Sequence, residues 1–232
     1  MRPINLIVIH CSASPDGISL ARFSPGAAVA LTAAQTIDGW HQQRGFLRAA
    51  LAGPRTEGIV RRDVLNPHLR HIGYHFVIDV DGTVLTGRGL DEPGAHAAGF
   101  NAESIGICLV GTASYTRAQW RALTELLVGG PGPFATPVGL AKRYQIPLAS
   151  PQRRISLRGN PAVRVVNGVC GHRDLSPDQN RNGAVEPFEW LKTCPGFDVG
   201  AWLRSNLAPP PFAVLDPLVA RAADLPTGDA HA

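Results

Sequence analysis

Two histidines and a cysteine stand where the chain could hold a metal ion. His10 closes the apolar run 5–10, and His172 directly follows the apolar run that ends at 171. A side chain at a strand end is rigidly held and faces a sheet edge, where open α/β sheets build their sites. Cys194 lies farther downstream. Two imidazoles and a thiolate suit Zn²⁺, and three protein ligands leave a fourth position for a water that zinc would activate for hydrolysis.

Residue type alone does not settle this metal site. Either histidine taken singly is more often a structural or solvated residue, and the spacing is not that of a zinc finger. Three further cysteines lie in or beside apolar runs, and we interpret them as buried thiols rather than as a disulfide framework: Cys11, Cys108 and Cys170. We expect His41, His68 and His71 to lie on the surface.

A second metal site is predicted in the loop 178–189, which fits the calcium-loop pattern D-x-[DN]-x-[DN]-G-x5-E. The expected oxygen ligands are the side chains of four residues and one backbone carbonyl: Asp178, Asn180, Asn182, Glu189 and the carbonyl of Ala184. The flanking helices of an EF-hand are absent from the pattern, so a polar loop with turn residues is the alternative. Our hypothesis is that Ca²⁺ orders this loop and thereby positions Lys192 and Cys194.

The elements that must position these residues alternate between strand and helix patterns. We expect strands at 5–10, 74–80, 83–87, 104–110 and 163–170, and helices at 32–44, 116–129, 136–144 and 199–207. Thr32 and Thr116 are candidate N-caps, and Asp81-Gly82 is a hairpin signal. The order predicts one α/β domain over 1–207: a central mixed β-sheet flanked by helices, with the zinc site at the sheet edge in a surface cleft. We interpret 45–72 as a surface insertion and 208–232 as a Pro/Ala-rich tail.

Composition and charge narrow the classes of partner that the protein could bind. The 232 residues are 44% hydrophobic and 17% charged, with a net charge of +4, which allows a buried core and favours an anionic partner surface. The arginines are not interleaved with aromatic residues, so we expect no nucleic-acid binding. The first apolar run is too short for a signal peptide or a membrane span, so we expect cytoplasmic synthesis without membrane insertion. We also expect a monomer.

Six segments carry a resemblance to a known family. They resemble the type 2 N-acetylmuramoyl-L-alanine amidases, which include the amidase-type phage lysozymes and the peptidoglycan recognition proteins: Ile9–Ser14, Ile72–Ile78, Gly94–Asn101, Ser104–Gly111, Gly171–Asp174 and Lys192–Asp198. The segments follow the family's order and span roughly residues 4–205. The resemblance implies that His10, His172 and Cys194 are zinc ligands.

The same resemblance implies the roles of further residues. Tyr74 and Lys192 match the residues credited with catalysis in the phage-lysozyme and recognition-protein branch. Relatives with Asp as the third ligand carry a Glu where this chain has Cys108, so we assign the base role to activated water assisted by Tyr74. Lys192 lies two residues from Cys194, on the same face of an extended segment, and its ammonium could stabilise an oxyanion by about 3 kcal/mol.

Two residues of the Gly94–Asn101 motif are expected to serve the substrate. We predict His96 and Asn101 as substrate-binding residues. The alternatives for His96 are a residue that supports a metal ligand and a loop histidine that stabilises Asn101 or the backbone. His75 should face away from Tyr74, because neighbouring side chains of a strand point to opposite faces.

The resemblance implies hydrolysis of the amide bond between N-acetylmuramic acid and L-alanine in peptidoglycan. The partner would be peptidoglycan or its muropeptides, and the protein would act on the cell wall after release, as an endolysin of a phage or prophage. Four alternatives stay open: a non-catalytic peptidoglycan-binding module, an interaction protein in the cytoplasm, a cytoplasmic amidase that recycles muropeptides, and an effector injected into rival cells.

Overall fold

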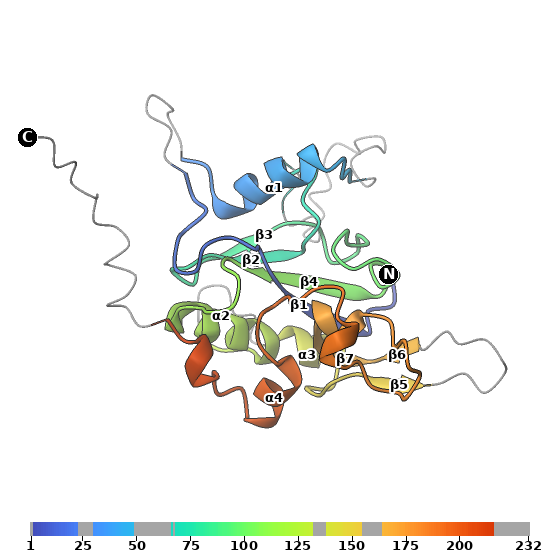
Figure 1. Cartoon of the computed structure of the whole chain (residues 1–232). Coiled ribbons are helices and arrows are strands. Elements are labelled where there is room, and N and C mark those ends of the chain that lie inside the picture. Colours follow the sequence, from blue (N-terminus) through green and yellow to red (C-terminus); the bar gives the residue numbers. More distant parts are fainter. Residues whose placement is uncertain are drawn as a thin grey trace, which may run out of the picture.

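The computed structural model describes residues 2–22, 30–48, 66, 68–131, 138–154 and 164–215. A five-stranded sheet in the order β3-β2-β4-β1-β7 forms its centre (Figure 1). The strands are β1 (Leu6–Cys11), β2 (Phe76–Ile78), β3 (Val84–Thr86), β4 (Ser104–Leu109) and β7 (Gly168–Gly171). β1 runs parallel to β4 and β7, β2 runs parallel to β4, and β3 runs antiparallel to β2. The sheet is therefore mixed, as predicted.

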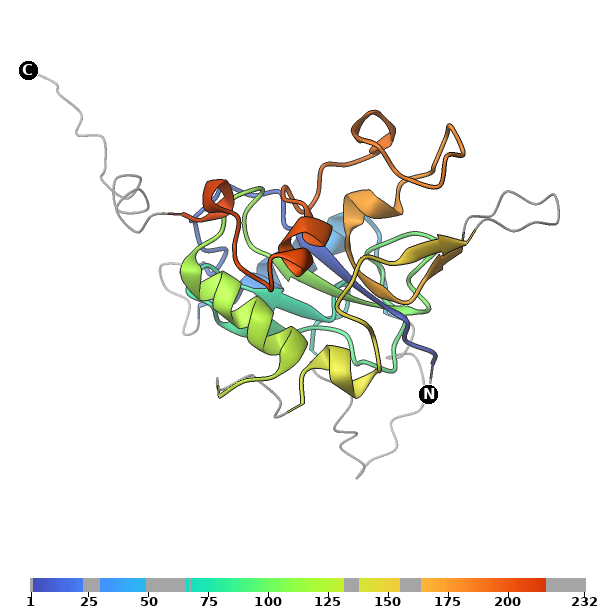
Figure 2. The same cartoon turned by 90° about the horizontal axis from the view of Figure 1, so that it is seen from below.

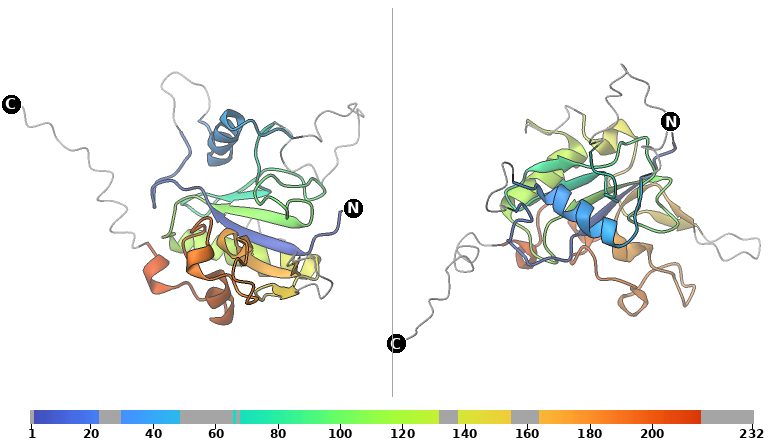
Figure 3. Two further views of the ribbon diagram at one scale, coloured as in Figure 1. Left: turned by 45° about the vertical axis from the view of Figure 1, so that its right-hand side comes forward. Right: turned by 90° about the horizontal axis from the view of Figure 1, so that it is seen from above.

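Helices cover both faces of this sheet. α1 (Ala33–Gln43) lies across one face, as Figure 3 shows. On the opposite face lie α2 (Arg117–Val128), α3 (Leu140–Arg143) and α4 (Val199–Arg204), which are in front in Figure 2. A small antiparallel pair, β5 (Gln152–Arg154) and β6 (Arg164–Val166), stands beside the sheet, and short 3₁₀ turns follow at η2 (His172–Leu175), η3 (Pro187–Glu189) and η4 (Pro211–Ala213). The predicted α/β fold is confirmed.

The strand β1 shows that the sheet is buried on both faces. Its alternate residues Ile7 and Ile9 join the large core beneath α2 and α4, which contains Trp120 and Trp202. Leu6 and Val8 face the other side with Cys170. Because both faces are covered, the strand is a continuous apolar run, as parallel strands usually are. His10 continues this second face and is itself buried.

Local signals fixed the two long helices and the hairpin as predicted. Thr32 caps α1 and Thr116 caps α2, each through a capping box with the glutamine three residues on. Gln119 also donates its side-chain amide to the carbonyls of Ile78 and Val110, which ties α2 to β2 and to the residue that follows β4. At the hairpin, Gly82 has a φ of 84°, a conformation that favours glycine.

Several boundaries differ from the prediction; the strand expected at 74–80, for example, is limited to Phe76–Ile78. The run 163–170 divides at Asn167 into β6 and β7, which belong to different sheets. The last helix ends at Arg204, and Asn206 and Leu207 adopt left-handed φ values of 57° and 63°, which a continuing helix does not allow.

The packed chain also runs on past residue 207, where the sequence placed the start of the tail. Ala213 is buried, and its carbonyl accepts hydrogen bonds from the backbone of Tyr115 and the indole of Trp120. The tail residues 216–232, the insertion residues 49–65 and 67, and the start of the predicted helix 136–144 lie outside the described residues. Among the residues that the structure does describe, no helix is both long and apolar enough to span a bilayer.

Candidate metal centre

The three predicted zinc ligands come together. One ligand atom from each of His10, His172 and Cys194 lies within 4.8 Å of the others. β1 and β7 are parallel neighbours in which Ile9 pairs with Gly171, so the two histidines follow each other across the same end of the sheet. Within the described ranges, this is the group of His, Cys, Asp and Glu side chains that could hold a metal ion.

Cys194 is brought to the strands by a firmly held loop. Its carbonyl accepts the backbone N–H of Arg173 at 2.9 Å, and its Sγ accepts the backbone N–H of Cys11 at 3.1 Å. The second bond favours negative charge on the sulfur, whereas the thiol of Cys11 and burial raise the pKa of Cys194 above its usual value. The loop continues through Gly196, where an added Cβ would lie 2.5 Å from the Cα of Ala113, so only glycine allows this approach.

The donor set fits Zn²⁺. Burial is the main cause that lowers the pKa of His10 well below its usual value, with the nearby His96 adding to the effect. Burial and then the charge of Lys192 lower the pKa of His172 to about 4. Both rings are therefore neutral at pH 7 and offer a free lone pair, which coordination of a cation requires. Two imidazoles and a sulfur are a zinc-binding set with an open fourth position.

Tyr74 lies beside the centre. Its ring centroid is 5.1 Å from that of His10 and 5.3 Å from that of His41. Burial is the main cause that raises the pKa of Tyr74 well above its usual value, and the neighbouring Cys108 adds to the effect. Tyr74 therefore keeps its proton at neutral pH and can serve as a hydrogen-bond donor rather than as a base.

A cavity of about 450 Å³ opens next to the centre, in agreement with the predicted surface cleft. Lys192 is exposed at this cavity, and its charge acts on the neighbouring His172. The predicted residues His96 and Asn101 line it as well. The full lining is Phe46, Ala95, His96, Ala97, Ala98, Asn101, His172, Leu175, Ser176, Leu191 and Lys192.

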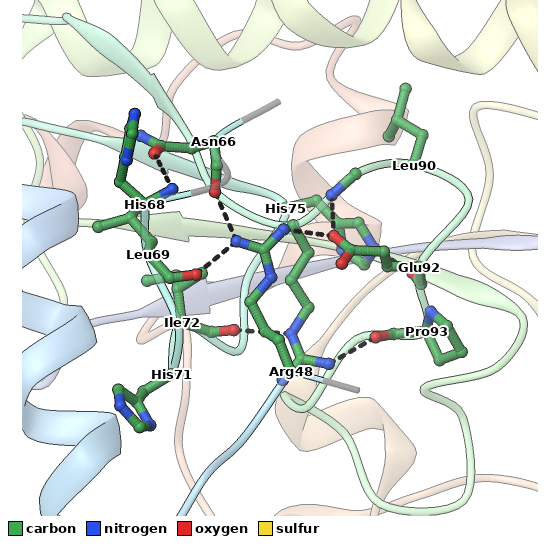
Figure 4. A network of polar contacts seen from close by, with 12 residues as sticks. Arg48, Asn66, His68, Leu69, His71, Ile72, His75, Leu90, Glu92 and Pro93 are labelled. Atoms are coloured by element: carbon green, nitrogen blue, oxygen red, sulfur yellow. Dashed lines mark hydrogen bonds and ion pairs between the residues drawn. The ribbon is translucent and has the colours of Figure 1, made fainter. Parts of the chain in front are cut away.

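A buried ion pair holds the loop that leads into this cavity (Figure 4). Arg48 Nη2 lies 2.6 Å from Glu92 Oε2, and both side chains are almost fully buried. Arg48 also donates to the carbonyl of Leu69 at 2.5 Å, and Arg88 donates to the carbonyls of Ile72 and Pro93. The network joins the end of the α1 region to the segment that carries His96.

We expect Glu92→Gln to lower the free energy of unfolding by about 3–5 kcal/mol, because the buried Arg48 charge would lose its partner. Urea denaturation followed by circular dichroism measures the change. The matched control is Glu125→Gln, which removes an i,i+4 pair whose partner Arg121 has a 71% exposed side chain. The control should cost less than about 1 kcal/mol. Equal losses in the two variants would contradict a stabilising role for the buried pair.

The predicted calcium loop is held by its own hydrogen bonds. Asp178 accepts the N–H of Gly183, and the carboxylate of Glu189 accepts backbone N–H groups of Gln179, Asn180 and Glu186. The other proposed ligands form short turns, in which Asn180 accepts from Asn182 and Asn182 accepts from Ala184. In the described part of the chain, no metal-ligand group includes these residues. The calcium site has no support from the structure, and the polar-loop alternative accounts for the contacts.

One histidine lies where the sequence did not place it. His41, expected at the surface, is buried, and its Nδ1 accepts the N–H of Gly73 at 2.9 Å. Its position four residues after Ile37 on the apolar face of the helix was the available signal. His75 is buried and accepts the N–H of Gly106 at 3.0 Å, and its ring lies 5.7 Å from that of His96, which the Tyr74 ring also approaches, at 6.2 Å.

Comparison with known proteins identifies the family of the chain. Residues 1–197 match the protein family described as N-acetylmuramoyl-L-alanine amidase. An endolysin of Klebsiella phage KP32 is 31% identical over 208 residues, covering 86% of this chain and 85% of the endolysin. The endolysin of Enterobacteria phage T3 is 33% identical over 208 residues, with coverages of 86% and 85%. The solved amidase LysC from Clostridium intestinale is 21% identical, with coverages of 89% and 86% and a TM-score of 0.46. The chain belongs to the N-acetylmuramoyl-L-alanine amidase family.

Proposed function

We propose that the protein is a zinc-dependent enzyme that hydrolyses the amide bond between N-acetylmuramic acid and L-alanine in peptidoglycan. The observation that carries this proposal is the convergence of His10, His172 and Cys194 beside a cleft lined by Lys192. Membership of the amidase family supports the reaction type, and the donor set supports the metal.

Each residue has a role that its position favours. Zn²⁺ held by the two histidines and the cysteine would supply an activated water and polarise the scissile carbonyl. Lys192 would place its ammonium near the carbonyl oxygen, where negative charge develops in the transition state. Tyr74, which keeps its proton, would donate a hydrogen bond to the same region. The cavity beside the centre would hold the glycan and the peptide that flank the bond.

The main rival is a non-catalytic peptidoglycan-binding module. Such a module needs the cleft, but it does not need a complete set of metal ligands together with Lys192 and Tyr74. The presence of all five in one place favours an enzyme: His10, His172, Cys194, Tyr74 and Lys192. Two relatives over most of the chain are endolysins, so we further propose cell-wall lysis by a phage or prophage as its role.

Mass spectrometry of purified peptidoglycan after digestion tests the reaction. We expect glycan strands that carry a free lactyl carboxylate and peptides that begin with an unmodified L-alanine. A chelator should stop the reaction, and added Zn²⁺ should restore it. Unchanged glycan strands, or cleavage within the peptide, would contradict the proposal. Faster release from intact cell walls than from soluble muropeptides would favour lysis over recycling.

A further inference from the structure

His10 makes different contacts with its two ring nitrogens. Its Nδ1 lies 3.8 Å from the Sγ of Cys194, on the side where the metal ligands converge. Its Nε2 lies 3.0 Å from Nδ1 of His96, on the opposite side of the ring. The two rings meet nearly edge to face, with an interplanar angle of 81°. Nδ1 is therefore the nitrogen of His10 that is available to a cation.

This geometry determines where the protons must lie when a cation is bound. A neutral His10 that offers its Nδ1 lone pair carries its proton on Nε2. That proton points to Nδ1 of His96, which must then be the acceptor and carry its own proton on Nε2. Nε2 of His96 faces the hydroxyl of Ser104 at 3.4 Å, and this hydroxyl donates to the carbonyl of Phe100 at 2.7 Å. Each donor in this series of hydrogen bonds meets one acceptor.

The imidazole of His96 occupies a slot that two glycines leave open. A Cβ on Gly106 would lie 2.5 Å from Cδ2 of His96, and a Cβ on Gly94 would lie 2.3 Å from the same atom. Contacts below 3.0 Å are not tolerated, so any other residue at either glycine would displace the ring. β4 supplies both Gly106 and Ser104, which places the slot on the central sheet.

The backbone of His96 is fixed as well. The side-chain oxygen of Asn101 accepts the N–H of His96 at 2.8 Å and the N–H of Ala97 at 2.9 Å. Asn101 therefore has a partner within the protein for the oxygen that the sequence assigned to substrate. Asn101 thus fixes the backbone of His96, and the glycine slot fixes its imidazole beside His10.

We propose that His96 is a positioning residue of the metal centre. It accepts the Nε2 proton of His10, selects the tautomer whose Nδ1 lone pair faces the metal, and so strengthens metal binding. The inference rests on the proposed function only in taking Zn²⁺ as the resident metal. Hydrogen-bond partners of this kind orient metal-binding histidines, and their loss lowers metal affinity by about 10–100-fold.

Zinc affinity of a matched pair of variants tests the proposal. His96→Asn keeps an acceptor oxygen near the position of Nδ1, whereas His96→Leu has a similar shape and no acceptor. Competition with a chromophoric zinc chelator should show about 10–100-fold weaker binding for His96→Leu, and binding within about threefold of the wild type for His96→Asn. His68→Ala is the control for loss of a histidine; the His68 side chain is exposed and should not affect the affinity.

Two further measurements separate positioning from a general effect on folding. Thermal unfolding of the metal-free variants reports whether each one folds. If His96→Leu does not fold, Ser104→Ala takes its place. This variant removes the hydroxyl that faces Nε2 of His96 and should also weaken zinc binding. Nitrogen-15 NMR of the zinc-loaded wild type should show His10 and His96 each protonated on Nε2.

The outcomes distinguish this inference from the proposed function. If the folded acceptor-less variant binds Zn²⁺ as tightly as the wild type, or if His10 binds zinc through Nε2, the role of His96 is wrong although the metal centre stands. If the wild type itself does not bind Zn²⁺, the proposed function fails.

Discussion

Cys194→Ala is expected to abolish zinc binding at the centre and to lower the turnover of peptidoglycan by more than about 10³-fold. The reason is chemical: a zinc-bound water has a pKa near 7, against about 15.7 for bulk water, so loss of the metal removes the hydroxide available at neutral pH. Dye release from labelled cell walls measures the turnover, and elemental analysis of the dialysed protein measures the bound zinc.

The control for this variant is Cys170→Ala. Cys170 is also a buried thiol, but it packs with Leu6 and Val8 and is not part of the ligand group. It should leave both zinc content and turnover close to those of the wild type. A Cys194→Ala protein that retains one zinc per chain and full turnover would show that the metal is held elsewhere.

Lys192→Met is expected to lower kcat by about 100-fold while zinc stays bound, since one well-placed donor to an oxyanion contributes about 3 kcal/mol. KM should change little, because the interaction forms in the transition state rather than with the bound substrate. Steady-state kinetics on a soluble muropeptide separates the two constants. A second readout is the pKa of His172 in the metal-free protein, which should rise because the charge of Lys192 helps to lower it.

Lys142→Met is the matched control for this lysine. Lys142 is exposed on α3, on the sheet face opposite α1, and does not line the cavity. Its removal should leave kcat unchanged. If Lys192→Met changed KM alone, Lys192 would bind the substrate rather than stabilise the transition state.

Much of the fold could be predicted because the signals are local. A capping threonine followed three residues later by glutamine begins both long helices, and an Asp-Gly pair forms the hairpin turn. These patterns involve residues within one turn of each other. They do not depend on how the rest of the chain folds.

The metal centre could not be predicted from spacing alone. His10 and His172 meet because β1 pairs in parallel with β7, a strand more than 150 residues away along the sequence. Periodicity does not report which strands pair. The prediction that these two histidines share one site therefore depended on the resemblance of six segments to a known family.

The supporting contacts were beyond sequence reasoning for the same physical reason. The pair Arg48–Glu92 and the slot that Gly94 and Gly106 form around His96 depend on loops that meet only in the folded chain. Nothing in a single glycine or arginine distinguishes such a position from a surface loop. The calcium pattern is the opposite case, a sequence signal without a matching site in the structure. The loop fits the calcium motif, but its carboxylates accept backbone N–H groups.

X-ray absorption at the zinc edge, measured on protein loaded with one equivalent of Zn²⁺, tests the central claim most directly. We expect one sulfur neighbour at about 2.3 Å and two imidazole nitrogens at about 2.0–2.1 Å from the zinc. Cys194→Asp should remove the sulfur from this spectrum. A zinc surrounded by oxygen and nitrogen atoms alone in the wild type would contradict the three-residue centre on which the proposed function depends.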